Sequence, residues 1–363
     1  MTRIHLVVLY GGQSAEHDVS CVTAAHVLGA IDPAKYRVTP VGISTSGEWA
    51  LGTSVQAALA AGAGALPPRL DPAGPAVTMT EVVAGTIDDE PTVVFPLLHG
   101  PLGEDGTVQG LFELANVAYV GSGVLGSAVA MDKAMAKQVL AANGIPQARF
   151  RAFAEHEVRD DLDGRAEQLA AALGLPCFVK PANMGSSIGV TKAHDVAELR
   201  DGIECALGYD EWLIVEEAVT GREIEVAVLG GTDPIASGAG EIVPGDEFYT
   251  YEDKYVTDGA QLLIPAPLSA EATAEVRALA VQVFRALRGD GLARVDFFYE
   301  EDRSDRPGRG FLCNEANTMP GFTPISMYPK LWQAAGMSYP ELIDRLVELA
   351  IERATRRRRN TKH

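Results

Sequence analysis

The sequence predicts an α/β fold that begins as a doubly wound parallel sheet and continues into a mixed α+β region. Over roughly the first 130 residues, continuous apolar segments that end in glycine or polar residues alternate with segments of helical spacing. Strands that are apolar throughout are typical of parallel sheets covered by helices on both faces. Later strands carry charged residues at every second position instead, which indicates a sheet with one polar face.

The amino-terminal elements follow from this pattern. Apolar segments predict buried strands at 4–10 (IHLVVLY), 37–44 (RVTPVGIS), 91–100 (PTVVFPLLHG) and 117–123 (VAYVGSG). The segment GGQSAEHDVS after the first strand is expected to be a loop that enters a helix over 20–31. The interval from Leu51 to Glu81 is rich in Ala, Gly and Pro, and we expect a surface excursion there.

The rest of the chain divides near residues 130 and 235. We expect an N-terminal α/β domain at 1–130, a central lobe at 131–235 and a C-terminal lobe at 236–363. The central lobe should contain a helix at 131–144, the segment CFVKPANMGSSIGV, a helix from Ala193, and strands at 212–219 and 222–231. In the C-terminal lobe, strands at 293–300 and 311–317 flank the charged turn EDRSDRPGRG, and a closing helix begins near Tyr339.

Composition excludes several classes of function. The net charge of −19 disfavours nucleic acid as a partner, because binding its phosphates requires a basic face. No apolar run approaches the roughly 20 residues of a membrane span, and the start MTRIHLVVLYGG is typical of a buried strand rather than a secretory signal, so we expect a cytoplasmic protein. The basic run at 356–360 is expected to be a solvated tail. The scattered cysteines (Cys21, Cys177, Cys205, Cys313) form no CxxC pair and are interpreted as reduced core residues.

Two predicted strands of the C-terminal lobe carry polar residues two positions apart. Arg294 and Asp296 should share one face of their strand, as should Glu315 and Asn317. If the strands pair across the charged turn, two carboxylates and an amide meet, and oxygen ligands of this kind suit Mg²⁺. The alternative is an exposed acid pair with Arg294 as its ion-pair partner.

A phosphate site would give such a metal a role. The chain has neither GxxxxGK[ST] nor GxGxxG. Lys180 instead precedes a Gly/Ser loop whose backbone N–H groups could bind phosphate oxygens, and Lys133 begins a predicted helix. Glu216 and Glu223 beside a strand connection could accept hydrogen bonds from adenine or ribose, although glutamates next to turns are commonly only solvated.

The order of these motifs resembles that of the D-alanine–D-alanine ligases, members of the ATP-grasp superfamily. The resemblance covers roughly residues 4 to 350 and rests on eight segments in order: GGQSAEHDVS, LHGPLGEDGTVQG, MDKAMAK, KPANMGSSIGV, EEAVTGREIEV, FYTYEDKY, ARVDFF and NEANTMPGFTPIS. It implies a two-lobed ATP-grasp fold after the N-terminal domain. It also implies that ATP phosphorylates one D-alanine and that a second D-alanine attacks the acyl phosphate, giving a dipeptide for peptidoglycan synthesis.

The resemblance further implies cofactors, partners and alternatives. ATP is the cosubstrate, with two Mg²⁺ ions that Mn²⁺ can replace, and the family implies a homodimer. A D-alanine–D-lactate ligase is the nearest alternative, and Tyr255 disfavours it, because those enzymes typically have a histidine in that loop. The segment GDEFYTYEDKYVTDGAQ, which carries Tyr255, is interpreted as a mobile loop over the site. A catalytically silent nucleotide-binding module is a further alternative.

Residue roles are carried over by motif position. The metal ligands implied are Asp296, Glu315 and Asn317. The nucleotide contacts implied are Lys133, Lys180, Ser187, Glu216, Glu217, Val219, Glu223 and Lys254. The first D-alanine is expected to contact Glu16 through its ammonium, with Ser186 and Tyr255 hydrogen-bonded to Glu16, and His99 near its carboxylate. The oxyanion would be stabilised by Arg294 and the Gly321 N–H, and the second D-alanine would contact Ser326 and Met327.

Overall fold

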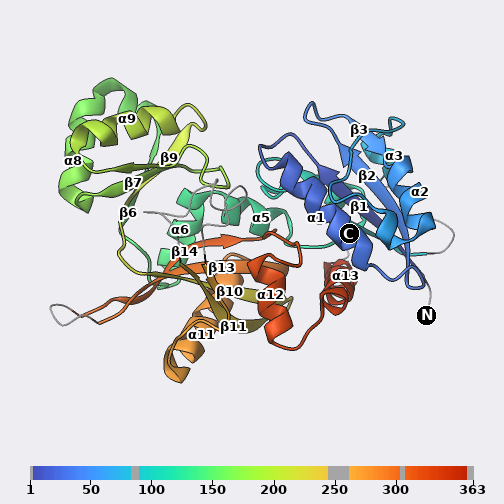
Figure 1. Cartoon of the computed structure of the whole chain (residues 1–363). Coiled ribbons are helices and arrows are strands. Elements are labelled where there is room, and N and C mark those ends of the chain that lie inside the picture. Colours follow the sequence, from blue (N-terminus) through green and yellow to red (C-terminus); the bar gives the residue numbers. More distant parts are fainter. Residues whose placement is uncertain (1–2, 83–89, 244–260, 303–306, 358–363) are drawn as a thin grey trace, which may run out of the picture.

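Three β-sheets organise the chain (Figure 1). The structure is a computed structural model, and it describes residues 3–82, 90–243, 261–302 and 307–357. A mostly parallel sheet forms the N-terminal domain, a four-stranded sheet forms a central lobe, and a five-stranded antiparallel sheet lies between these two in the view of Figure 1. The predicted α/β start followed by a two-lobed α+β region is confirmed.

The N-terminal sheet has the order β3-β2-β1-β4-β5. Its centre is β1 (Ile4–Gly11), which is buried from His5 onward and pairs in parallel with β2 (Tyr36–Ile43) and β4 (Thr92–Pro96). β5 (Ala118–Tyr119) continues the parallel set, and β3 (Trp49–Leu51) is an antiparallel edge strand. The helices of this domain are α1 (His17–Ala30), α2 (Thr53–Ala61), η1 (Ala63–Ala65), α3 (Met79–Val82), α4 (Thr107–Leu114) and α5 (Val124–Met131).

One expectation for this domain is confirmed and one was wrong. The surface excursion expected over 51–81 is confirmed, since most of its residues are exposed; it contains α2 and η1, because its alanines favour helix, and Val55 and Leu70 anchor it in the core. The strand expected over 117–123 is only the two-residue β5, since Gly121 adopts a φ of +97° that ends extended structure.

The central lobe has the sheet order β6-β9-β7-β8, and all of its pairs are antiparallel. The strands are β6 (Phe150–Ala154), β7 (Cys177–Pro181), β8 (Thr191–Ala193) and β9 (Trp212–Glu217), and the helices are α7 (Glu155–Val158), η2 (Arg159–Asp161), α8 (Leu162–Leu173) and α9 (Val196–Ala206). The helix expected from Ala193 begins only at Val196. Ala193 pairs with Cys177 in the sheet, and the Asp195 side chain caps the helix by accepting from the Glu198 N–H.

The third sheet has the order β12-β11-β10-β13-β14. Its strands are β10 (Arg222–Gly230), β11 (Ile235–Val243), β12 (Gln261–Leu263), β13 (Gly291–Glu300) and β14 (Gly310–Asn317). One core cluster joins this sheet to α6 (Lys133–Ala142) and α11 (Ala270–Ala286). α12 (Met327–Ala334) and α13 (Tyr339–Arg357) belong to another cluster that also contains residues of β1 and β4. β10 belongs to this sheet although it precedes residue 235. The divisions near 130 and 235 therefore stay a sequence-based proposal.

Helix α13 ties the C-terminal lobe to the N-terminal domain. Arg353 donates to the Gly121 carbonyl at 2.7 Å, and its guanidinium lies 3.8 Å from the centre of the Tyr119 ring. Arg356 pairs with Asp290 at 2.5 Å, and Arg357 pairs with Glu113. The expected tail from residue 356 is therefore part of α13 at these two arginines; Arg356 is half-buried, Arg357 is exposed as expected, and the rest of that run lies outside the described residues.

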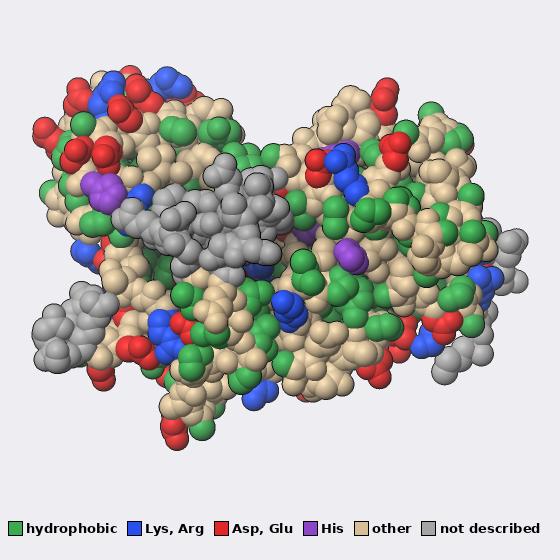
Figure 2. Space-filling view, viewed as in Figure 1, with side chains coloured by type: hydrophobic (Ala, Val, Ile, Leu, Met, Phe, Trp, Pro, Cys, Tyr) green, Lys and Arg blue, Asp and Glu red, His purple; other side chains and the backbone are tan. Residues whose placement is uncertain are grey.

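The surface and the cysteines complete the description. All four cysteines are free, and Cys205, expected in the core, is exposed on α9 because it faces away from the helix positions that pack on the sheet. Within the residues that the structure describes, no helix is long and apolar enough to cross a membrane. The molecular outline is notched between the central lobe and the N-terminal domain (Figure 2).

Candidate active site

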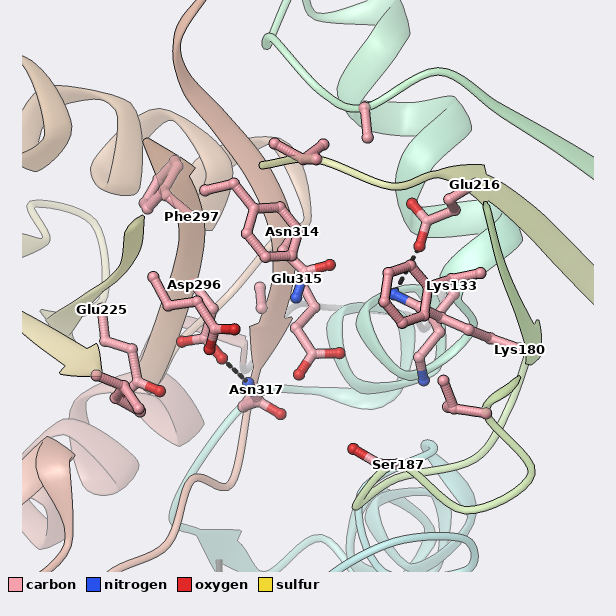
Figure 3. A pocket seen from close by; sticks show the side chains of 18 of the residues that line it. Lys133, Lys180, Ser187, Glu216, Glu225, Asp296, Phe297, Asn314, Glu315 and Asn317 are labelled. Carbon is pink, nitrogen blue, oxygen red and sulfur yellow. Dashed lines mark hydrogen bonds and ion pairs between the residues drawn. The ribbon is translucent and has the colours of Figure 1, made fainter. Parts of the chain in front are cut away.

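Strands β13 and β14 present a polar face to a cavity, as their two-residue spacing predicts. Arg294 lies opposite Asn317, and Asp296 lies opposite Glu315. The register then shifts, since Phe297 lies opposite Cys313 and leaves Asn314 as an extra residue in β14. Such a bulge re-aims the neighbouring side chains. The structure therefore brings together the four residues that the sequence placed on adjacent strands (Figure 3).

Arg294 and Asp296 form a two-pronged ion pair. The Arg294 Nε and Nη2 atoms lie 2.8 Å and 2.7 Å from the two Asp296 carboxylate oxygens. Glu225, on β10, lies 3.1 Å from the Arg294 guanidinium. Burial opposes the charged form of Arg294, but Asp296 and Glu225 outweigh it and raise its pKa well above the usual value. Because Asp296 is only 9% exposed, the alternative of an exposed acid pair is wrong.

The polar face lines a cavity of about 690 Å³ between the central sheet and the five-stranded sheet. Its walls include most of the residues predicted for the nucleotide, the metal and the reacting groups: Lys133, Lys180, Ser186, Ser187, Glu216, Glu217, Val219, Glu223, Arg294, Asp296, Glu315 and Asn317. A volume of this size is in the range of sites for nucleotide-sized ligands. Carboxylates on one wall thus face lysines on the other (Figure 3).

Two lysines converge on the buried carboxylate of Glu216. Lys180, at the end of β7, lies 2.7 Å from Glu216 Oε2, and Lys137, on α6, lies 2.6 Å from Oε1. Burial alone would raise the pKa of Glu216, but the two lysines outweigh it and lower the pKa to about 2. Glu216 also raises the pKa of Lys180 against the effect of burial.

Lys133 begins α6, where Asp132 caps the helix by accepting from the Met135 N–H. Its ammonium donates to the Met184 carbonyl, at the start of the Gly/Ser loop. Burial lowers the pKa of Lys133, and the negative charge of Glu315 partly opposes that effect. A desolvated cation that makes no hydrogen bond to a carboxylate among the described residues is well suited to binding an anion.

The Gly/Ser loop has the backbone conformation of an anion-binding turn. Ser186, Ser187 and Gly189 have φ values of +49°, +60° and +71°. Left-handed residues in succession turn backbone N–H groups toward one point, which creates a site for phosphate oxygens. Ser187 points its hydroxyl into the cavity (Figure 3).

The end of β9, its connection to β10 and the start of β10 also line the cavity. Glu217, Val219 and Glu223 lie there, in that order along the chain. Glu217 is held by Arg149 at 2.7 Å and by Arg309, the residue before β14, at 2.5 Å. This carboxylate is committed to joining the two lobes, so a contact between Glu217 and a nucleotide base would be made by its backbone.

A second group of residues adjoins the cavity from the N-terminal domain. Glu16 precedes α1 and accepts a hydrogen bond from the Ser186 hydroxyl of the central lobe. A Cβ atom at Gly185 would lie 2.9 Å from Glu16 Oε2, and one at Gly100 would lie 3.0 Å from the same oxygen. Glycines at these two positions therefore let the loops approach the carboxylate.

His99 lies beside this group with its ring buried. Its Nδ1 atom is 3.1 Å from the Met319 carbonyl, so Nδ1 carries the proton that it donates. Its Nε2 atom is buried and has no hydrogen-bond partner among the described residues. Burial lowers the pKa of His99 against the opposing effects of Glu16 and the Met319 backbone, and the ring is then neutral with Nε2 as an acceptor.

The segment after β14 carries the remaining predicted residues. A Cβ atom at Gly321 would lie 3.2 Å from the Ser326 hydroxyl oxygen, so these two residues are neighbours. The Ser326 hydroxyl also lies 2.8 Å from that of Thr323. Met327 is buried in the core against Gly240 and does not line the cavity. Lys254 and Tyr255 lie outside the described residues.

Three residues near the site carry no role in the sequence analysis. Lys137 follows Lys133 by one helical turn within MDKAMAK, so helical spacing could have identified it. Glu104 lines the cavity, and it lies in LHGPLGEDG, the same segment that contains His99. Glu225 lies two residues after Glu223 on β10, and its proximity to Arg294 depends on strand pairing that the sequence alone does not give.

Comparison with known proteins agrees with the geometry. Models of the D-ala D-ala ligase N-terminus and C-terminus match residues 5–122 and 139–348. A D-alanine–D-alanine ligase of Bacillus cytotoxicus is 46% identical over 97% of both chains, and one of Halothermothrix orenii is 44% identical over 97% of this chain and 99% of its own.

Solved structures show the same fold. The D-alanine-D-alanine ligase from Coxiella burnetii aligns with a TM-score of 0.79 at 34% identity, covering 98% of this chain and 96% of that one. The VanG D-Ala:D-Ser ligase from Enterococcus faecalis aligns with the same TM-score and identity, covering 96% and 99%. The chain belongs to the D-alanine–D-alanine ligase family.

Proposed function

We propose that this enzyme joins two D-alanine molecules at the expense of ATP and supplies the dipeptide to peptidoglycan precursor synthesis. The observation that carries the proposal is the contact between Glu16 and Ser186 at the edge of the cavity. This contact links the Glu16 carboxylate, which is suited to a substrate ammonium, with the Gly/Ser loop, which is suited to ATP phosphates. A carboxylate substrate bound between them would lie next to the nucleotide.

The reaction has two steps. A carboxylate oxygen of the first D-alanine attacks the γ-phosphorus, the bond to the β-phosphate oxygen breaks, and ADP and an acyl phosphate result. The amine of the second D-alanine then attacks the acyl carbon. The carbonyl electron pair moves to oxygen, the C–O bond to phosphate breaks, and a proton leaves the new amide nitrogen.

The chain's residues have distinct roles in this proposal. Lys133, Lys180 and the Ser187 loop bind phosphates, with Glu216, Glu217, Val219 and Glu223 around the base and ribose, and Lys254 assisting. Glu16 orients the first substrate, supported by Ser186 and Tyr255. Arg294 and the Gly321 N–H stabilise the oxyanion, a type of contact worth roughly 10² to 10³ in rate. Ser326 binds the second substrate's carboxylate.

Two assignments require more than their position. A neutral His99 offers an acceptor at Nε2, which can contact the ammonium of the first D-alanine. Only a protonated His99 could contact the carboxylate of that substrate. The side chain of Met327 is in the core, so its effect on the second substrate is indirect. It fixes the start of α12, directly after Ser326.

Mg²⁺ fits the site by donor chemistry. Within the described part of the chain, no three His, Cys, Asp or Glu side chains are grouped to hold a metal. Asp296, Glu315 and Asn317 offer oxygen atoms from paired strands, and few protein ligands completed by phosphate and water suit Mg²⁺. We propose two Mg²⁺ ions, replaceable by Mn²⁺, which neutralise phosphate charge when bound. We also propose a homodimer in the cytoplasm.

The test is phosphate release from ATP with a panel of D-amino acids and D-hydroxy acids, with each product identified by mass. D-Alanine should give D-alanyl-D-alanine. Preferential use of D-lactate or D-serine as the second substrate would overturn the assigned specificity, and release without any dipeptide or depsipeptide would overturn the ligase. Sedimentation at several concentrations tests the dimer.

A further inference from the structure

The chain crosses from the central lobe to the five-stranded sheet through a short connection at residues 218–221. It leaves β9 at Glu217 and enters β10 at Arg222. Glu217, Ala218 and Val219 line the cavity there. The proposed function assigns the base of the nucleotide to this stretch. A backbone that binds a ligand between two lobes needs both of its ends held in place by supporting contacts.

The start of the connection is held within the central lobe by Arg149, the residue before β6. The Arg149 Nε atom lies 2.7 Å from one Glu217 carboxylate oxygen, and the Arg149 backbone N–H donates to the other at 2.9 Å. The Glu217 N–H donates to the Arg149 carbonyl at 3.0 Å, and the Ala218 N–H donates to the Pro176 carbonyl at 3.2 Å. These contacts fix the start of the connection to the central lobe, but they do not reach the five-stranded sheet.

The end of the connection rests on β13. A Cβ atom at Gly221 would lie 2.8 Å from the Tyr299 carbonyl oxygen, so a glycine is needed for this close approach. The next residue, Arg222, lies opposite Tyr299 in the β10–β13 pair. The end of the connection is therefore fixed to the five-stranded sheet, one residue before Glu300, the last residue of β13.

Arg309 joins the two ends. Its Nε and Nη2 atoms lie 2.5 Å and 3.1 Å from the two Glu300 carboxylate oxygens, and its Nη1 atom lies 2.5 Å from a Glu217 carboxylate oxygen. The Glu300 and Glu217 side chains are only 9% and 10% exposed, so protein groups rather than water hold them. Burial opposes the charged form of Glu217, but hydrogen bonds from Arg149 and Arg309 outweigh it and lower its pKa.

We propose that Arg309 is a positioning residue for nucleotide selectivity: by tying Glu217 to Glu300, it sets the spacing of the lobes at which the 218–221 connection and its flanking backbone meet adenine. This inference rests on the proposed function. Arg309 does not line the cavity, so it acts through Glu217 rather than by contact with the nucleotide.

The chemistry of the base makes this role measurable. Adenine presents an amino donor and a ring-nitrogen acceptor side by side, a pattern that a backbone carbonyl and N–H can match. Hypoxanthine, the base of ITP, presents an acceptor and a donor in the reverse arrangement. A site built for one arrangement rejects the other, whereas contacts with the phosphates treat ATP and ITP alike.

The test uses Arg309→Met in the full-length enzyme, with kcat/KM for dipeptide formation measured with ATP and with ITP. The value for ATP should fall about 10-fold, because a small displacement of a binding group can cost up to about 100-fold. The value for ITP should stay within about twofold, so the preference for ATP should fall about 10-fold. Arg345→Met is the matched control. Arg345 has the same 39% side-chain exposure and also pairs with two glutamates, Glu348 and Glu352 on α13, and its replacement should leave the preference unchanged.

Two further variants show whether Arg309 acts through Glu217. Glu217→Gln should also lower the preference, and the double variant Arg309→Met/Glu217→Gln should be no worse than Glu217→Gln alone, because both changes act on one contact. Arg309→Lys has a single ammonium that cannot span both carboxylates; it should lower the preference in the same direction and replaces Arg309→Met if that variant does not fold.

The outcomes separate this proposal from the proposed function. An unchanged preference in the folded Arg309 variant, an equal fall for ATP and ITP, effects that multiply in the double variant, or a wild-type enzyme that uses ITP as well as ATP overturns the role of Arg309. A wild-type enzyme that makes no dipeptide from ATP and D-alanine overturns the proposed function instead.

Discussion

The Asn317 side-chain amide donates a 3.0 Å hydrogen bond to Asp296 across the β13–β14 pair. The same carboxylate receives both prongs of Arg294. Asp296 is therefore oriented by protein groups on two sides. Glu315, directly opposite on β14, acts on Lys133, Lys180 and Arg294 through its negative charge.

These contacts predict the outcomes of two isosteric substitutions. Glu315→Gln should lower Mg²⁺-dependent phosphate release by at least about 100-fold, since even outer partners of metal ligands are worth 10- to 100-fold. Asp296→Asn should lose activity too and should also lower the free energy of unfolding by about 3 kcal/mol, because the buried Arg294 charge loses its two-pronged partner.

Phosphate release measures the activity, and urea denaturation measures the free energy of unfolding. The metal assignment is wrong if Glu315→Gln keeps normal turnover at limiting Mg²⁺. The electrostatic argument for Asp296 is wrong if Asp296→Asn unfolds at the same urea concentration as the wild type.

Replacement of Lys137 should lower the free energy of unfolding and weaken nucleotide binding. Lys137→Met leaves buried Glu216 with one of its two lysines, and breaking a buried ion pair costs about 3 kcal/mol. Lys180 would then be held more tightly by Glu216, so the KM for ATP should rise about 10-fold.

Lys35→Met is the matched control, since the Lys35 side chain is 56% exposed in its pair with Asp344. An exposed pair of this kind contributes little to stability, because solvent screens its charges. Urea denaturation and ATP titration should separate the two variants clearly, and equal effects would mean that burial of the Lys137 pair is unimportant.

Replacement of Ser326 should weaken binding of the second substrate selectively. Ser326→Ala removes a donor to a carboxylate, a bond worth about 1.5–3 kcal/mol, so the KM for D-alanine at the second site should rise about 10- to 100-fold. The KM for ATP should not change. Ser338→Ala, which removes an exposed hydroxyl that bonds Glu341, is the control. A parallel rise in both KM values for Ser326→Ala would contradict the assignment.

The polar face of β13 and β14 could be predicted from sequence because its geometry is local. A strand repeats every two residues, so Arg294 with Asp296 and Glu315 with Asn317 needed only correct strand assignment and one pairing. The bulge at Asn314 did not disturb the prediction, because the register shift comes after the Asp296–Glu315 pair.

Other features depended on contacts between distant segments. Nothing in the sequence near His99 indicates that its ring reaches the Met319 carbonyl, because their meeting requires the packing of segments far apart in the chain. The arginines at 356 and 357 looked like a tail because only their partners, Asp290 and Glu113, give them a structural role. Met327 follows Ser326 directly, but the start of α12 turns its side chain into the core.

A histidine in the N-terminal sheet predicts the acid dependence of stability. His5, on β1, is buried, and its two ring nitrogens lie 2.9 Å from Thr39 and 3.2 Å from Thr92 hydroxyl oxygens. Burial, and secondarily the positive charge of Arg37, lower the pKa of His5 to about 4, while Glu90 acts in the opposite direction.

Between pH 6.5, the ordinary pKa of the side chain, and pH 4, the unfolded chain binds a proton that the folded chain does not. The free energy of unfolding should therefore fall as the pH is lowered through this window, by up to about 3 kcal/mol from His5 alone. Below pH 4 both states bind the proton, and His5 adds no further slope. His5→Gln should flatten this part of the curve in urea denaturation measured at steps of pH, whereas His26→Gln, at an exposed position of α1, should leave it unchanged. If the slope of the His5→Gln variant matches that of the wild type across the window, the buried neutral histidine is not the source of the acid sensitivity.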